Sequence, residues 1–202
     1  MRCSLPFTRF ARATAVLLAV AVAGCAPRTT AGSDAAASGT HAAATERAAG
    51  AGADAGDVAA LRAQQQDLIA ALPLARHVHC AQHSPASADS FEFEGFFSGP
   101  DLICVKVTAP AQWDSTGTTA YTYARGRMLG LHNEFTRKPA TGPSQRLVED
   151  VLFAGDGSIA DASLTLNGLP RRIEPRAFLR AMADNRRLAA QAYSVVWEHR
   201  NE

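Results

Sequence analysis

The sequence predicts an α+β domain in which an antiparallel β-sheet carries an N-terminal helix and a C-terminal helix. Three observations predict it: helical spacing of apolar residues at the start of the folded region, a middle run of short β-rich segments, and a second amphipathic stretch at the end. Helices that bracket a run of strands are typical of α+β folds, whereas doubly wound sheets alternate the two. We therefore expect a meander with both helices on one face.

The first helix is expected to begin at Asp57, which is a suitable N-cap, and to end at Pro73. Its apolar residues recur at helical spacing, at Val58, Leu61, Leu68, Ile69 and Leu72. The segments 77–83, 91–97 and 102–108 then combine β-branched and aromatic residues and are separated by turn residues. These segments predict the first three strands.

Two hairpins are expected next. Segments 120–124 and 128–137 flank Arg125-Gly126-Arg127, and segments 146–153 and 158–166 flank Ala154-Gly155-Asp156-Gly157. Gly-containing turns of this kind favour strand reversal, and Asn167-Gly168 predicts one more reversal before a short strand at 169–173. Glu174-Pro175 opens the final helix, since proline suits the first helical turn. Its apolar stripe consists of Phe178, Met182, Ala189, Tyr193 and Val196.

The N-terminus has the three parts of a secretory signal: arginines, an apolar run at 13–21, and small residues around a cleavage point. The residues Val22-Ala23-Gly24-Cys25 resemble the lipobox of bacterial lipoproteins. The resemblance implies that Cys25 is acylated and becomes the mature N-terminus. Ala26 in place of Asp then implies the periplasmic face of the outer membrane. An ordinary secreted protein or a retained anchor is the alternative.

Three segments follow from this interpretation. Residues 1–24 are the signal peptide, residues 25–56 are the lipidated N-terminus and tether, and residues 57–202 are one domain. Between 26 and 56 the chain contains no Val, Ile, Leu or aromatic residue, so it lacks the apolar surface needed to fold. We expect a disordered linker there.

The net charge and the number of cysteines further limit the partners and the chemistry that we expect. Removing residues 1–24 leaves 17 Lys+Arg against 19 Asp+Glu, because three of the 20 basic residues lie in that segment, so nucleic acid is not an expected partner. Once Cys25 is acylated, Cys80 and Cys104 remain in an oxidising compartment, and we expect a disulfide between them. The alternative is that one or both are metal thiolates.

His77 and His79 are the sharpest candidate ligands, because alternate residues of a strand project from one face and could share Zn²⁺ or Cu²⁺. A complete site would need further ligands, for which His132 and Glu134 are the other candidates. The alternative is that both histidines are simply exposed strand residues. We expect no cofactor.

Catalytic motifs are missing from the sequence: it has no Gly-x-Ser-x-Gly, Ser-x-x-Lys or His-Glu-x-x-His. Aromatic and arginine residues, which dominate interface hot spots, gather in one stretch and could form a partner-binding surface: Trp113, Tyr121, Tyr123, Arg125 and Arg127. The alternative is that the tyrosines belong to the core. We therefore expect a membrane-anchored periplasmic lipoprotein that binds a protein partner and is no enzyme, more narrowly an inhibitor or immunity protein for a periplasmic hydrolase or toxin. The alternative function is metal binding by His77 and His79.

Overall fold

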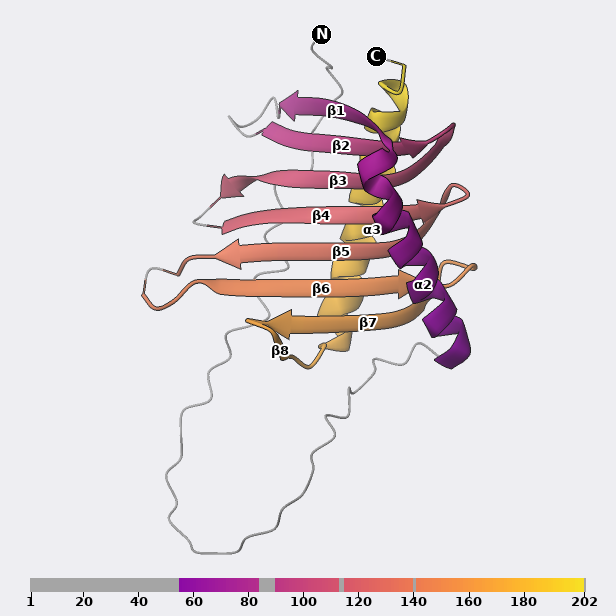
Figure 1. The fold of residues 1–202 in the computed structure, drawn as a ribbon. Helices are drawn as coiled ribbons and strands as arrows, with labels where there is room; N and C mark the ends of the chain where they lie inside the picture. The colour runs from indigo at the N-terminus through magenta and orange to yellow at the C-terminus, as the bar shows by residue number, and fades with distance from the viewer. Residues whose placement is uncertain (1–54, 84–89, 113–114, 140, 202) are drawn as a thin grey trace, which may run out of the picture.

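A computed structural model describes residues 55–83, 90–112, 115–139 and 141–201 and confirms the α+β class (Figure 1). Eight consecutive strands form one antiparallel meander in which each strand pairs with the next. The predicted signal peptide, lipidation site and most of the tether lie outside the described residues. The strands are β1 (Arg76–His83), β2 (Ser90–Ser98), β3 (Asp101–Gln112), β4 (Ser115–Ala124), β5 (Arg127–Arg137), β6 (Gln145–Phe153), β7 (Ile159–Leu166) and β8 (Leu169–Pro170).

The two helices begin and end close to where the sequence predicts. Helix α2 (Ala55–Ala71) leads into a 3-10 turn (Leu72–Leu74) that contains Pro73. Helix α3 (Pro175–Glu198) is capped by Glu174, whose carboxylate accepts hydrogen bonds from the backbone N–H groups of Arg176 (3.4 Å) and Ala177 (2.6 Å).

Two tight turns join β4 to β5 and β7 to β8. Arg125 and Gly126 have φ values of 51° and 73°, and Asn167 and Gly168 have values of 53° and 79°. Two successive positive φ angles match the right-handed twist of the flanking strands, as in a type I′ turn. The β4–β5 turn is therefore one residue shorter than predicted, and Arg127 is the first residue of β5.

The main core lies between the sheet and α3. One cross-strand row runs through Gly95, Val105, Tyr121, Leu131 and Val151. Gly95 allows α3 to approach, because a Cβ at this position would stand 1.9 Å from Cγ1 of Val196. On the same side, Phe97 packs beside Trp197 with ring centroids 6.0 Å apart.

The helices lie on opposite faces of the sheet, which corrects the expectation that they share one (Figure 1). The hydroxyl groups of Tyr121 and Tyr123 donate hydrogen bonds to Asn185 Oδ1 and to the Ala189 carbonyl of α3, both at 3.3 Å. Thr122 lies between these tyrosines and contacts α2 instead, through Gln65 Nε2 at 3.5 Å. Since side chains alternate along a strand, the two helices must cover different faces.

Candidate functional site

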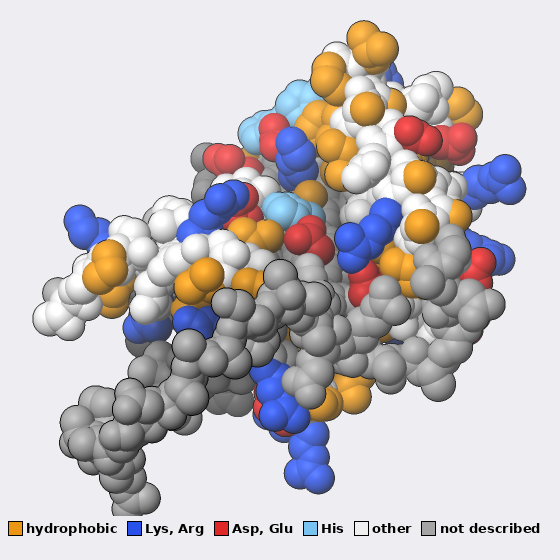
Figure 2. Space-filling view, turned by 60° about the horizontal axis from the view of Figure 1, so that its bottom comes forward, with side chains coloured by type: hydrophobic (Ala, Val, Ile, Leu, Met, Phe, Trp, Pro, Cys, Tyr) orange, Lys and Arg blue, Asp and Glu red, His pale blue; other side chains and the backbone are white. Residues whose placement is uncertain are grey.

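Helix α2 covers only one end of its face of the sheet. It is held there by contacts of Gln65 with Thr122 and of Arg62 with Asp161. Many polar side chains lie on the rest of that face, and Figure 2 shows histidine, acidic and basic groups gathered on this side. We call this surface the uncovered face and define it by His79, Glu92, Glu94, Lys106, His132, Glu134, Arg146 and Asp150.

The strand register places these residues together although they are far apart in sequence. His79 pairs with Glu94, and Glu94 pairs with Lys106 across β1, β2 and β3. Further along the same row, His132 of β5 pairs with Asp150 of β6. The uncovered face therefore draws its side chains from five strands of one sheet.

An ion-pair network crosses β5 and β6. His132 Nδ1 lies 2.7 Å from Asp150 Oδ1, and its Nε2 lies 3.9 Å from Glu134 Oε2. Arg146 Nε donates a 2.7 Å hydrogen bond to Glu134 Oε1. The hydrogen bond to Asp150 raises the pKa of His132, and the hydrogen bond from Arg146 lowers the pKa of Glu134. The network therefore runs from the Arg146 guanidinium through the Glu134 carboxylate and the His132 imidazole to the Asp150 carboxylate.

A second polar cluster lies on β1, β2 and β3. His77 Nε2 is 3.2 Å from Glu94 Oε1, and the His77 ring stacks on Phe96 with centroids 4.9 Å apart. Lys106 Nζ lies 5.0 Å from the centre of the same Phe96 ring. Phe96 is thus covered by one imidazole and one ammonium group.

The predicted metal ligands do not come together. His77 and His79 share a face, as the alternation predicts, but His132 and Glu134 lie on β5, four strands away, or about 19 Å at the usual strand spacing. Within the described part of the chain, no three His, Cys, Asp or Glu side chains are grouped closely enough to hold a metal ion. The four residues therefore do not make up one site.

The predicted disulfide is not formed. Cys80 is opposite Phe93 and Cys104 is opposite Phe96, so the two cysteines lie on strands separated by β2 and project from opposite faces. A disulfide needs Cα atoms about 4.4–6.8 Å apart and Cβ atoms directed toward each other. Burial raises the pKa of the Cys104 thiol to about 12, so this thiol is not activated as a nucleophile.

The predicted partner-binding residues are dispersed. Tyr121 and Tyr123 are buried beneath α3, so the alternative interpretation, that they belong to the core, is the one the structure supports. Arg125 is at the tip of the β4–β5 turn, and Arg127 lines a pocket on the side of the sheet that α3 covers. Trp113 lies outside the described residues.

Sequence reasoning missed the pairing of His132 with Asp150 and of Glu134 with Arg146. His132 and Glu134 are two residues apart, and this spacing places them on one face of β5. The β5–β6 register then decides their partners, and the long connection between these strands leaves that register open in the sequence.

Comparison with protein-family models, curated proteins and solved structures finds no match for this chain. None of the helices in the part of the chain that the structure describes is long and apolar enough to cross a membrane.

Proposed function

We propose that this chain is a lipid-anchored binding protein without enzymatic activity, attached through Cys25 to the periplasmic side of the outer membrane, and that its uncovered face binds a protein partner. The lipobox-like residues 22–25 support the anchor. A tether that ends near residue 56 would let the folded domain reach a partner beside the membrane.

The observation that carries the binding role is the charge of the uncovered face. It presents four carboxylates, on Glu92, Glu94, Glu134 and Asp150, against two permanent cations, Lys106 and Arg146. The carboxylates of this surface therefore outnumber its permanent cations by two. Complementary charge steers association and selects partners, so the expected partner carries a basic surface.

The narrower proposal is an inhibitor or immunity protein that covers a basic active-site region of a periplasmic hydrolase or toxin. A continuous sheet suits that task, because strand pairing fixes the backbone from which these side chains project. Metal binding by His77 and His79 has less support, since His77 is engaged by Glu94 and Phe96.

Charge reversal tests the binding surface. The double variant Glu92→Lys/Asp150→Lys changes two exposed acids of the uncovered face, and Asp101→Lys/Glu198→Lys makes the same charge change at exposed positions elsewhere. We expect the unchanged protein and the second variant to capture the same basic protein from a periplasmic extract, and the first variant to lose it. Equal capture by both variants would overturn the proposal.

The anchor is tested separately. Cys25→Ala should abolish incorporation of labelled palmitate and move the protein from the membrane fraction to the soluble fraction. A Cys3→Ala variant is the matched control, because Cys3 lies within the predicted signal peptide. Palmitate labelling that survives Cys25→Ala would contradict lipidation at this residue.

A further inference from the structure

The corner of the domain where β8 meets the start of α3 exposes leucine and arginine side chains together. Leu169 is 64% exposed and Leu179 is 60% exposed, although both are large apolar residues. Exposed arginines lie in the same stretch of chain, between residues 169 and 180. We call this surface the basic corner and define it by Leu169, Arg171, Arg172, Arg176, Leu179 and Arg180.

The first part of the basic corner is fixed to the edge of the sheet. Leu169 of β8 pairs with Leu166 of β7. Arg171 N donates a 2.9 Å hydrogen bond to the Leu164 carbonyl, and Ile173 packs against the core. The exposed side chains of this part therefore project from a backbone that pairing and packing hold in place.

The second part of the basic corner is the outer side of the first turns of α3. Leu179 and Arg180 follow Arg176 by three and four residues, so these side chains are neighbours on the helix surface. Phe178 lies between them in sequence and packs against the core instead. The helix thus directs one aromatic ring inward and a leucine with two arginines outward.

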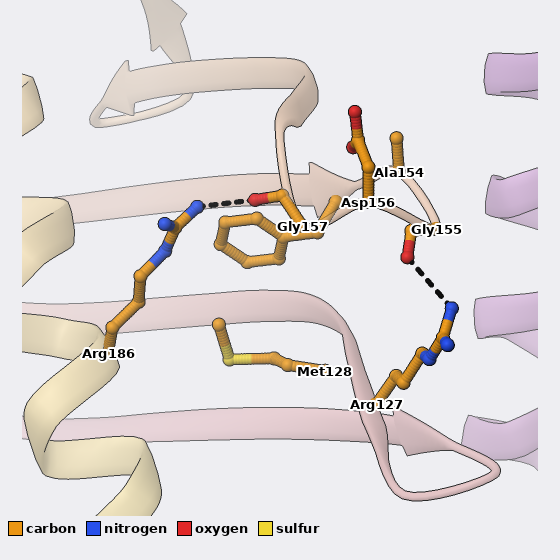
Figure 3. A pocket seen from close by; sticks show the side chains of 8 residues that line it. Arg127, Met128, Ala154, Gly155, Asp156, Gly157 and Arg186 are labelled. Carbon is orange, nitrogen blue, oxygen red and sulfur yellow. Dashed lines mark hydrogen bonds between the residues drawn. The ribbon is translucent and has the colours of Figure 1, made fainter.

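The arginines of the basic corner are not neutralised by the rest of the described domain. None of the four forms an ion pair with another described residue. The acids between positions 169 and 190 are already engaged, because Glu174 caps α3 and Asp184 is bonded to Arg187. By contrast, Arg186 of the same helix donates a 2.6 Å hydrogen bond to the Gly157 carbonyl (Figure 3). The basic corner is therefore a local excess of uncompensated positive charge.

The predicted tether joins the domain at the same edge of the sheet. Arg62 of α2 contacts Asp161 of β7, and Gln65, one turn later, reaches β4. Helix α2 therefore begins, at Ala55, on the β7 side of the sheet, where β8 and the start of α3 also lie (Figure 1). Cys25 precedes Ala55 by 30 residues. A flexible chain of that length spans roughly 30 Å on average, so an acylated Cys25 would keep the basic corner close to the membrane.

We propose that the basic corner docks onto anionic lipid headgroups of the membrane that holds the anchor, with its arginines at the phosphates and its two leucines at the acyl boundary. This inference rests on the proposed function, because it takes the lipid anchor at Cys25 as its premise. Arginines are attracted to anionic lipid surfaces, and exposed leucines beside them add apolar contact at the interface. The anchor makes docking intramolecular, so a small patch is enough to orient the domain. The uncovered face, on the opposite side of the sheet from α3, then stays accessible to its partner.

Tryptophan quenching by lipids with brominated acyl chains tests the docking. The full chain is reconstituted into phosphatidylcholine vesicles with or without phosphatidylglycerol, which is anionic. Leu179→Trp places a tryptophan in the basic corner, and Leu74→Trp places one at a leucine that is 92% exposed at the other end of α2. The native tryptophans are common to both variants. We expect phosphatidylglycerol to increase quenching at position 179 about twofold or more and to leave position 74 unchanged.

Matched charge variants identify the groups that recognise the lipid. Each arginine near an anionic surface favours the docked state about fivefold, so Arg176→Gln/Arg180→Gln in the Leu179→Trp chain should remove most of the increase. Arg137→Gln/Lys138→Gln removes two exposed cations at the end of β5 and should retain it. Equal loss in both double variants would overturn the assignment to the basic corner.

The remaining outcomes separate docking from the anchor. No increase at position 179 would overturn the proposal and leave an acidic protein as the occupant of the basic corner, and equal quenching in both kinds of vesicle would overturn recognition of anionic headgroups. Palmitate labelling reports the anchor independently. A labelled chain without quenching contradicts only the docking, whereas an unlabelled chain with quenching contradicts only lipidation at Cys25.

Discussion

The same strands form both faces of the sheet, but one face is buried and the other is mostly exposed to solvent. Toward α3, Phe93, Val105, Tyr121 and Leu131 are almost completely buried and form one continuous core. Toward α2, most of the face is left to solvent and to ion pairs, because this helix covers only one end of it. One face therefore holds the fold together, while the other leaves polar side chains accessible to a partner.

The α3 face also buries polar side chains beside its apolar row. Asn133 Nδ2 donates a 2.6 Å hydrogen bond to Glu149 Oε2, and both side chains are buried. Asn133 Oδ1 and Asn185 Nδ2 have no hydrogen-bond partner among the described residues. Buried polar atoms without a hydrogen-bond partner lower the free energy of unfolding. The α3 face is therefore less stable than it would be if all its buried polar atoms were paired.

The largest difference in the free energy of unfolding is expected between alanine variants of two phenylalanines of β2. Phe93 is fully buried toward α3, whereas Phe96, three residues later, is only half-buried on the opposite face. Phe93→Ala should lower the free energy of unfolding by about 3–5 kcal/mol, and Phe96→Ala by about 1 kcal/mol. Chemical denaturation of both variants measures this, and similar losses would contradict the division between the faces.

Two glycines provide the next comparison. A Cβ at Gly95 would meet the branched, buried side chain of Val196 at 1.9 Å, whereas a Cβ at Gly130 would meet the end of the Gln65 side chain at 2.2 Å. Val196 is completely buried, whereas Gln65 is a long, partly exposed side chain on α2. Gly95→Ala should therefore cost about 1–3 kcal/mol, and Gly130→Ala less than about 1 kcal/mol. A larger loss at Gly130 in thermal or chemical unfolding would show that α2 is as tightly packed as α3.

The buried Glu149 carboxyl group makes the stability of the α3 face depend on pH. Burial raises the pKa of its carboxyl group above the ordinary value of 4.5. For a raised folded-state pKa, the stabilising contribution is complete below pH 4.5 and is lost as the pH rises through the folded value. Glu149→Gln should remove this loss, so the variant should be more stable than the unchanged protein at pH 7.

Unfolding measurements at lower pH provide the control for the Glu149→Gln variant. The stability advantage of Glu149→Gln should shrink as the pH is lowered toward 4.5, because both proteins then hold a neutral side chain beside Asn133. Unfolding curves at several pH values measure the difference. An advantage for glutamate at neutral pH would mean that the carboxylate is better solvated than its burial implies.

The helices, strands and turns were predicted well from the sequence. The face that each helix covers and the pairing of the cysteines were not. Turn residues such as Arg125-Gly126 and Asn167-Gly168 mark the strand reversals, and Glu174-Pro175 marks the start of α3, because these signals depend only on backbone geometry. The face that each helix covers depends on packing across many strands. The cysteine pairing failed for the same reason, since an even count in the sequence contains no information on whether two side chains share a face.

The smallest expected effect belongs to the uncovered face. The hydrogen bond with Asp150 is the main cause of the raised pKa of His132, and the charge of Glu134 contributes less. Asp150→Asn should therefore lower the pKa of His132, measured by NMR titration of its ring proton, more than Glu134→Gln does. The raised pKa stabilises the fold fully below the ordinary histidine value of 6.5, and this gain is lost as the pH rises through the folded value. Asp150→Asn should therefore reduce stability at pH 5 more than at pH 8. Since 42% of the His132 side chain is exposed, that reduction should stay below about 1 kcal/mol. A stability loss comparable to that of Phe93→Ala would mean that the ion pairs, rather than the core beneath α3, hold this part of the sheet together.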